Sequence, residues 1–275
     1  MIPVCIPTYK HPKYDYIDRV LKAKEFEQVK YTHPLYYFIY DMDWDSFNYD
    51  LYKDKFEELH FVKVSFQQYK SAMKMKKFIQ EYMTSLNIPF FFLFDNDVSL
   101  GARGYDYNLN RMVNLETNQF LDLWESMEEI NDYAICKPCA YWMAIKHDKK
   151  PEKEFRFCKN PVQCILINNR LLNEHNITYT GDTECAEDME IGVNCLKAGL
   201  KVGEMENYFV GNVQPMGNSD AAWYNLSELV NKTYNKLSNT GFLLLKTDKK
   251  GIAKLSLRET RVDPDFLPEL KNDLW

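Results

Sequence analysis

The sequence predicts a single α/β domain with a mostly parallel sheet flanked by helices. Short apolar runs alternate with helical segments over the first hundred residues, an order typical of β-α-β units with right-handed crossovers. The run from 88 to 94 is aromatic and uninterrupted, as expected for a strand buried on both faces. This run ends in the carboxylates Asp95 and Asp97. Ligands of open α/β sheets bind at such strand ends.

The expected elements follow from apolar periodicity and from turn residues. In the first hundred residues we expect strands over 2–8, 35–40, 60–65 and 90–94, with helices over 15–27 and 70–86. The helix over 70–86 is amphipathic and rich in Lys and Met. Its position before the acid-bearing strand makes it a crossover helix.

The second part of the chain predicts a polar loop over 101–108, a helix near 117–129, and strands over 134–138 and 162–167 separated by a charged loop. A helix over 185–199 then ends at Gly199, a common C-cap residue. A strand over 201–209 follows, then a helix near 222–235 and an apolar run over 241–245. We therefore expect one domain over 1–216 and a C-terminal appendage over 217–275 that packs on it.

The composition is that of an ordinary globular protein. Of 275 residues, 45% are hydrophobic and 27% are charged, and the net charge is −6. This charge does not indicate a nucleic-acid-binding protein as a whole, although a local basic groove is compatible with it. No signal peptide and no apolar run of membrane-spanning length is present. The sequence predicts a cytoplasmic protein without a membrane partner.

The seven cysteines are scattered, which suits reduced thiols. Cys136 and Cys139 have the spacing of zinc ligands, but a zinc site would need Cys158 and Cys164 as well. That second spacing is loose, and Cys164 lies in an apolar run. Free cysteines in the core are the favoured interpretation.

Asp95 and Asp97 are the strongest candidate site residues. Two carboxylates near each other are costly unless a positive group neutralises them. A hard divalent cation that also touches a phosphate meets that need with few protein ligands. The alternative is that both acids only cap or form a turn at the strand end.

A second acidic pair, Glu187-Asp188, begins the helix predicted over 185–199. Acids in a first helical turn complement the helix dipole, which alone could explain them. An acid that points from a helix start into a cleft also suits a general base or an anchor for an acceptor hydroxyl. The sequence leaves both interpretations open.

Weaker candidates lie at the ends of the first two strands and on the Lys-rich helix. Pro7, Thr8 and Tyr9 follow the first strand, where a loop could cover a nucleotide base, and Asp41 follows the second strand. The alternatives are an edge strand and a solvated turn. Lys74 (or Lys70) could direct a cation at a diphosphate, although lysines on such a helix are more often a solvated face.

Taken together, the ordered set Val4–Tyr9, Asp95–Asp97 and Glu187-Asp188 resembles the GT-A fold glycosyltransferases, over roughly residues 2–212. The resemblance implies that Asp97, with Asp95, holds Mn²⁺ or Mg²⁺ on the diphosphate of a nucleotide-sugar donor. It also implies that Asp188, beside Glu187, contacts or deprotonates the acceptor hydroxyl. Many of these enzymes supply a late His to the metal, whereas this chain has none beyond His175. Asn212 or Gln214 could substitute, or that ligand is water.

A narrower resemblance is to the TET/JBP-associated glycosyltransferases, a group that includes phage enzymes. It rests on Ile6–Lys10, Phe91–Val98, Gln163–Asn168 and Glu187–Glu190. It implies that a sugar, expected to come from a UDP-sugar donor, is attached to hydroxymethylated pyrimidines such as hydroxymethylcytosine in phage DNA. Gln163, Asn168 and Arg103 are then the candidate acceptor-binding residues, and the host cytoplasm is the expected compartment.

Two rivals to a DNA acceptor remain open at this point. One is a glycosyltransferase that acts on a polysaccharide, lipid or protein, and the other is a non-catalytic nucleotide-sugar-binding module. A nucleotidyltransferase is disfavoured because the segment 8–12 lacks the glycines of a phosphate-binding loop. The sequence does not specify the sugar, the anomeric outcome or the oligomeric state.

Overall fold

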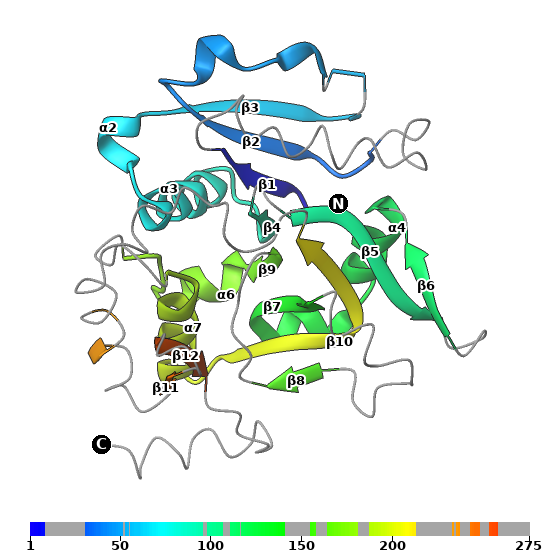
Figure 1. Cartoon of the computed structure of the whole chain (residues 1–275), viewed down its shortest axis with the longest axis vertical. Helices are drawn as coiled ribbons and strands as arrows, with labels where there is room; N and C mark the ends of the chain where they lie inside the picture. Colours follow the sequence, from blue (N-terminus) through cyan, green and yellow to red (C-terminus); the bar gives the residue numbers. More distant parts are fainter. Residues whose placement is uncertain are drawn as a thin grey trace.

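The computed structural model describes residues 1–8, 31–51, 53–54, 56–95, 98–106, 111–115, 117–140, 155–157, 164–180, 187–212, 233, 235–236, 243–247 and 253–257. Its main element is a ten-stranded sheet in the order β3-β2-β1-β4-β9-β7-β10-β5-β6, with β8 paired to β10. Figure 1 shows this sheet with its helices, and a separate two-stranded sheet, β11-β12, beside α7.

The first half of the sheet is parallel, as the sequence predicts. It consists of β1 (Val4–Pro7), β2 (Leu35–Tyr40), β3 (Leu59–Val64) and β4 (Phe90–Phe94). β4 is buried on both faces, since Phe91 and Leu93 join one hydrophobic core and Phe92 and Phe94 join the other. This confirms the interpretation of the aromatic run.

The second half of the sheet is mixed, so the expectation of a mostly parallel sheet holds only for the first half. β9 (Cys164–Asn168) lies between β4 and β7 (Tyr133–Ala140) and is antiparallel to both. β10 (Lys201–Asn212) is parallel to β7 and antiparallel to β8 (Phe155–Phe157). The segment expected as a polar loop forms most of β5 (Val98–Asp106), which pairs with β10 and with β6 (Arg111–Leu115).

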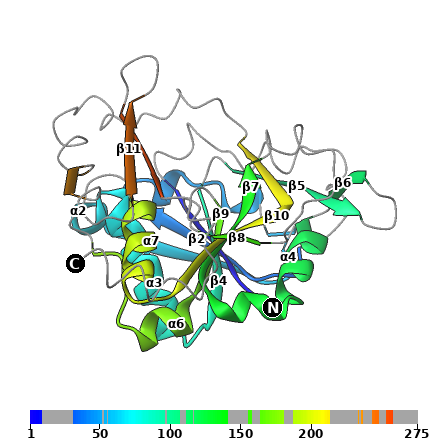
Figure 2. The same ribbon diagram turned by 90° about the horizontal axis from the view of Figure 1, so that it is seen from below.

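The helices form two layers on the sheet (Figure 2). α3 (Ala72–Ser85), α6 (Asn169–Glu174) and α7 (Glu187–Lys197) lie on one side, and α4 (Thr117–Glu125) lies on the other. The short elements are α2 (Phe66–Tyr69), η1 (Trp44–Ser46), η2 (Tyr49–Leu51) and η3 (Glu128–Asp132). Each layer encloses one hydrophobic core: Met73, Ile79 and Leu196 belong to the first, and Phe120 and Trp124 to the second.

The ends of the two helices that matter for the site follow local rules. Ser71 is the N-cap of α3, and its hydroxyl accepts a hydrogen bond from the Lys74 backbone N–H at 3.2 Å. α7 ends at Lys197, and Gly199, the residue predicted to terminate it, follows with a φ of 78° that suits glycine. α7 begins at Glu187 with three acids in its first turn, where they complement the helix dipole.

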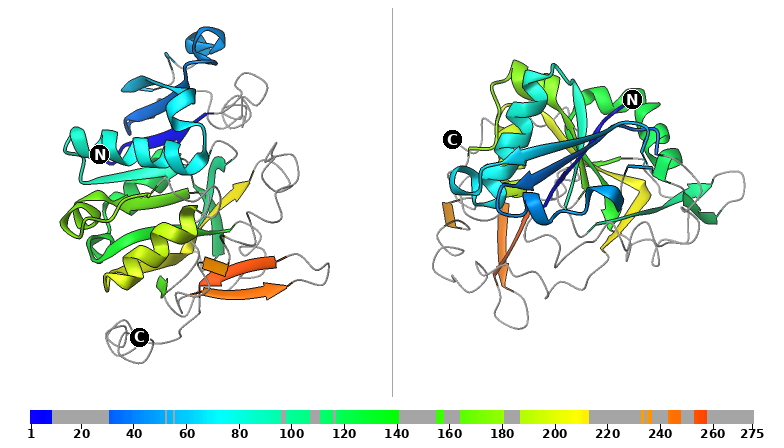
Figure 3. Two further views of the ribbon diagram at one scale, coloured as in Figure 1. Left: turned by 90° about the vertical axis from the view of Figure 1, so that its left-hand side faces the viewer. Right: turned by 90° about the horizontal axis from the view of Figure 1, so that it is seen from above.

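The C-terminal appendage is described only in part. Its antiparallel pair, β11 (Leu243–Thr247) and β12 (Ala253–Leu257), lies close to α7 (Figure 3). The expected helix over 15–27, and most of the expected helix near 222–235, fall outside the described residues. The proposed boundary at residue 216 therefore stays a prediction.

Candidate functional site

A buried lysine and three carboxylates form the centre of the candidate site. The ammonium Nζ of Lys76 lies 2.8 Å from Asp188 Oδ1, 3.1 Å from Glu187 Oε1 and 3.3 Å from Asp95 Oδ1. An ammonium group has three N–H donors, so each carboxylate has one donor within reach. The structure thus brings together both acidic segments that the sequence marks, at the side chain of one residue. We call Lys76, Asp95, Glu187 and Asp188 the Lys76 cluster.

Strand alternation explains why Asp95 reaches this cluster. Side chains alternate between the two faces of a strand, and Phe91 and Leu93 face the core that contains α3 and α7. Asp95 continues this series by two residues, one position beyond the end of β4. Glu187 and Asp188 reach the same place from the first turn of α7. The cluster therefore lies where the carboxyl end of β4 meets α3 and α7.

The burial of the cluster is uneven. The Lys76 side chain is only 5% exposed, and those of Asp188 and Glu187 are 12% and 16% exposed. Asp95 is 32% exposed. A ligand that approaches the cluster would thus meet Asp95 first.

The charges of the cluster do not balance, because three carboxylates face one ammonium group. Burial lowers the pKa of Lys76, but Asp188, Asp95 and Glu187 together raise it well above its ordinary value. Burial raises the pKa of Asp188 to about 8, and Glu187 and Asp95 add to this against the effect of Lys76. Burial likewise raises the pKa of Asp95. At Glu187 burial also acts to raise the pKa, but Lys76 and a backbone hydrogen bond together lower it below its ordinary value. The cluster therefore holds excess negative charge that a proton or a cation can neutralise.

Tyr179 lies in the same electrostatic neighbourhood. Burial raises the pKa of its phenol well above the ordinary value, and Asp188 adds to this effect. The hydroxyl is buried and has no hydrogen-bond partner among the described residues. The segment is held by Gln80 of α3, whose side chain accepts from the Tyr179 backbone N–H at 3.1 Å and donates to Ile177 O at 2.9 Å.

Lys76 is a residue that the sequence interpretation missed. That interpretation chose Lys74, which lies two residues earlier and hence about 200° around the helix, half-buried and away from the cluster. The signal lies in the helix pattern: Lys76 shares one helix face with Met73, Gln80 and Met83, at spacings of three, four and seven residues, and all are buried. A lysine on an apolar stripe needs a buried partner.

The predicted residues of the first two strands have structural partners. The backbone N–H and the hydroxyl of Thr8 both donate to Phe38 O, at 2.9 and 3.3 Å, and Pro7 ends β1. One carboxylate oxygen of Asp41 accepts from the backbone N–H groups of Met42 and Phe66, at 2.9 and 3.0 Å. These bonds fix the ends of β1 and β2, and a role of these residues toward a nucleotide stays a prediction.

Asn168 is not brought to the Lys76 cluster. Because β9 is antiparallel to β4, Asn168 pairs with Phe90 while Cys164 pairs with Phe94, beside Asp95. The Asn168 side chain is buried, accepts from the Leu171 N–H at 3.1 Å as the cap of α6, and donates to Asn131 O at 3.2 Å. Asn168 thus lies at the end of β9 away from Asp95, and a role of Asn168 toward an acceptor stays a prediction.

For the remaining candidates, either only the backbone position is described or the residue lies outside the described part of the chain. Arg103 lies in β5 opposite Asn114 of β6 and Phe209 of β10. Tyr9, Asp97 and Gln163 lie outside the described residues. Asn212, the possible extra metal ligand, pairs with Val98, the residue that directly follows Asp97.

The acids of the cluster are of the kind that binds a hard divalent cation, but their oxygens surround the Lys76 ammonium and not one shared ion position. Carboxylate oxygens are the ligands that Mg²⁺ and Mn²⁺ prefer, and the formal charge of the cluster is two negative, from three carboxylates and Lys76. Asp95 is the most exposed of these acids. Asp95 is hence the described residue best suited to bind the cation.

The cysteines agree with the favoured interpretation where they are described. The four described thiols are free and buried, and burial raises the pKa of each; they are Cys5, Cys136, Cys164 and Cys195. A second buried ion pair, Lys137 with Glu204, joins β7 to β10 at paired positions. It lies two strands from β4 and outside the Lys76 cluster.

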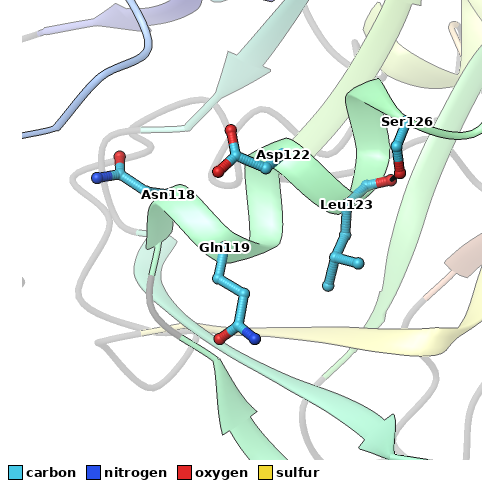
Figure 4. A pocket seen from close by; sticks show the side chains of 5 residues that line it. All are labelled: Asn118, Gln119, Asp122, Leu123 and Ser126. Atoms are coloured by element: carbon cyan, nitrogen blue, oxygen red, sulfur yellow. Dashed lines mark hydrogen bonds between the residues drawn. The ribbon is translucent and has the colours of Figure 1, made fainter.

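A surface depression on α4 lies away from this site. It is lined by Asn118, Gln119, Asp122, Leu123 and Ser126 (Figure 4). Asp122 Oδ1 lies 2.9 Å from His33 Nε2, and the other ring nitrogen of His33 lies 2.9 Å from Ile2 O. Glu125 is also within reach of this pair. These contacts tie α4 to the segments that lead into β1 and β2, on the face of the sheet opposite α3 and α7.

Comparison with solved structures identifies the fold. A mannosyltransferase from Pyrobaculum calidifontis, PcManGT, in complex with GDP-Man and Mn²⁺, matches with a TM-score of 0.52 and 11% identity, over 99% of this chain and 68% of that chain. S. aureus TarS 1–349 in complex with UDP-GlcNAc matches with a TM-score of 0.47 and 10% identity, over 87% of this chain and 70% of that chain. No protein-family profile and no curated protein sequence matches the chain.

The chain thus has the α/β fold of the GT-A glycosyltransferases, as predicted. At such low identity the likeness defines the fold, while function has to be argued from the site. None of the helices in the described part of the chain has both the length and the apolar character that a bilayer crossing needs.

Proposed function

We propose that this protein is a glycosyltransferase that moves a sugar from a nucleotide-sugar donor, a UDP-sugar, to a hydroxyl group of an acceptor. The Lys76 cluster is the observation that carries the proposal. It combines a strand-end carboxylate at the ligand-binding edge of an α/β sheet with two acids from the start of a helix. Excess negative charge on buried acids is rare without a ligand or a proton to offset it.

In this proposal Asp95, with Asp97, holds Mn²⁺ or Mg²⁺ against the donor diphosphate. The register of β10 supports Asn212 as a further ligand, because Asn212 pairs with Val98 next to Asp97. When bound, the metal stabilises the charge that develops on the departing nucleotide diphosphate. PcManGT was solved with both a nucleotide sugar and Mn²⁺.

Asp188 is the proposed base or anchor for the acceptor hydroxyl, with Glu187 beside it. A catalytic base works best when its pKa lies near the working pH, and burial raises the pKa of Asp188 to about 8. The Lys76 ammonium, 2.8 Å from Asp188 Oδ1, orients the carboxylate. Glu187, whose pKa is lowered mainly by Lys76 against the effect of burial, stays ionised and contributes charge.

The proposed acceptor is a hydroxymethylated pyrimidine in phage DNA. The sequence resemblance supports this choice, and so does one feature of the small sheet: Lys246 of β11 is directly paired with Lys254 of β12. A basic residue at each of two paired positions is a composition that suits contact with a phosphate backbone. Two further basic residues, Arg103 and Arg111, lie in β5 and β6, which pair with each other in the main sheet.

The test is nucleotide release from a panel of UDP- and GDP-sugars with Mn²⁺ or EDTA, with and without hydroxymethylcytosine-containing DNA. Release that depends on metal, is stimulated by this DNA and is lost in Asp97→Ala supports the whole proposal. Release without stimulation by DNA retains the glycosyltransferase and rejects the acceptor. Donor binding without turnover under every condition would indicate a nucleotide-sugar-binding module.

A further inference from the structure

We propose that Lys76 is a positioning residue that acts as the internal counter-cation of the site. It holds Asp95, Glu187 and Asp188 in one arrangement before a donor binds, and it limits how strongly the site attracts a divalent cation. The metal-binding part of this inference rests on the proposed function. The counter-cation role itself rests on contacts within the chain.

The first argument is the match between donors and acceptors. Lys76 has three N–H donors and three carboxylate neighbours at 2.8 to 3.3 Å. These neighbours come from the residue that follows β4 and from α7, which lie far apart in the sequence, and Lys76 comes from α3. A single side chain therefore fixes the relative position of two acidic segments that would otherwise repel each other.

The second argument is the rigidity of the helix that carries Lys76. α3 packs Met73, Ile79 and Met83 into the core, and each of these is at most 1% exposed. One turn after Lys76, Gln80 bonds both Ile177 O and the Tyr179 N–H. Lys76 thus projects from a helix that is held both by the hydrophobic core and by the hydrogen bonds of Gln80, as a positioning group requires.

The third argument concerns charge. The cluster has a formal charge of two negative with Lys76 and three negative without it. Removing a positive charge a few ångström from the carboxylates should tighten cation binding by about tenfold or more, at an effective dielectric constant near 20. A residue that only stabilises the fold would not produce this change, because its loss would disorder the ligands and weaken binding.

The experiment compares Mn²⁺ affinity, measured by electron paramagnetic resonance on the folded proteins, with donor turnover. Lys76→Met should bind Mn²⁺ at least about tenfold more tightly and lose about a hundredfold in kcat, since Lys76 no longer orients the carboxylate of Asp188. Lys197→Met, which removes an exposed lysine from α7, is the matched charge control and should change neither quantity more than about twofold.

A double variant protects the test against misfolding. Lys76→Met combined with Glu187→Gln removes one charge of each sign, so the formal charge returns to two negative. Its Mn²⁺ affinity should return to within about threefold of the wild-type value, because the charge term is restored. Unchanged or weaker Mn²⁺ binding by folded Lys76→Met, or a double variant that binds as tightly as the single one, overturns the inference.

The outcomes separate this inference from the proposed function. If the wild-type protein neither binds Mn²⁺ nor turns over a donor, the metal-dependent function fails. Mn²⁺ binding that then appears in Lys76→Met would still support the counter-cation role. Wild-type turnover with no change of Mn²⁺ affinity in Lys76→Met would leave the function intact and reject the role of Lys76.

Discussion

Replacing Asp188 with Asn should remove much of the pH dependence of stability between about pH 4 and pH 8. Burial raises the pKa of this carboxyl from its ordinary 3.8 to about 8 in the folded protein. Over that interval the folded state binds a proton that the unfolded state has released. The free energy of unfolding therefore falls as the pH rises, and it levels off above the folded-state pKa.

The magnitude follows from the same interval. Each tenfold change in proton affinity is worth about 1.4 kcal/mol, so a single group raised this far gives a ceiling of about 6 kcal/mol. Asp188 shares Lys76 with Asp95 and Glu187, so part of the effect moves to those acids when it is neutralised. We expect a loss of about 2 to 3 kcal/mol in the wild-type protein between pH 5 and pH 8, and less than half of it in Asp188→Asn.

Urea denaturation at half-unit steps of pH, in the presence of EDTA, measures this directly. Glu81→Gln removes an exposed carboxyl from α3 and serves as the control, with an expected slope equal to that of the wild-type protein. The side-chain amide oxygen that Asp188→Asn introduces can still accept from Lys76, so the fold should survive. An equal dependence of unfolding free energy on pH in the wild type and Asp188→Asn would refute the reasoning. A wild-type unfolding free energy that rises with pH over this range would refute it as well.

Three further predictions concern the core around the site. Phe92→Ala should destabilise the protein by about 3–5 kcal/mol in urea denaturation, because Phe92 is fully buried and its ring packs 5.6 Å from that of Trp124; a cost below about 1 kcal/mol would contradict this. Tyr179→Phe should be neutral or stabilising by up to about 1 kcal/mol, since its buried hydroxyl has no partner among the described residues, and a clear loss of stability would reveal a partner. Four buried thiols should react with a disulfide reagent at pH 8 only after denaturant is added, because burial raises the pKa of each: Cys5, Cys136, Cys164 and Cys195. Fast labelling of any of these four in the native protein, located by mass spectrometry, would contradict this prediction.

The first half of the fold could be predicted because its strands are short apolar runs that end in polar residues. β2 and β4 are recognisable from sequence alone because every β2 residue is buried and four of five are buried in β4. β5 could not be recognised in the same way. Its residues look like a polar loop, and its pairing with β10 and β6 is a tertiary effect that local preference does not record.

The direction of a strand was the second feature of the fold that could not be predicted from the sequence. The apolar run that became β9 was recognisable as a strand, but its residues carry no sign of whether it runs parallel to β4. Its antiparallel direction exchanges the two ends, so Cys164 rather than Asn168 lies beside the end of β4. A polar residue at the end of a strand therefore indicates a site only when the direction of that strand is known.

The acids of the site could be predicted, whereas their partner could not. Strand-end and helix-start acids occupy positions that local rules mark, and the structure brings Asp95, Glu187 and Asp188 together. Lys76 sits among other lysines on one helix, and only its place on the buried stripe separates it from them. Burial of a charge is expensive unless it is paired, so a lysine on an apolar stripe predicts a carboxylate partner from elsewhere in the chain.

The imbalance of the Lys76 cluster is what distinguishes it from an ordinary structural ion pair. The pair of Lys137 with Glu204 is buried and neutral as a unit, so it needs nothing further and is compatible with a role in holding β7 to β10. In the Lys76 cluster one ammonium faces three carboxylates, and Asp188 responds by taking up a proton below about pH 8. A cluster whose excess negative charge can be neutralised by a cation or a proton is suited to binding a charged ligand reversibly. Asp95, its most exposed member, lies at the sheet edge where ligands of such folds bind.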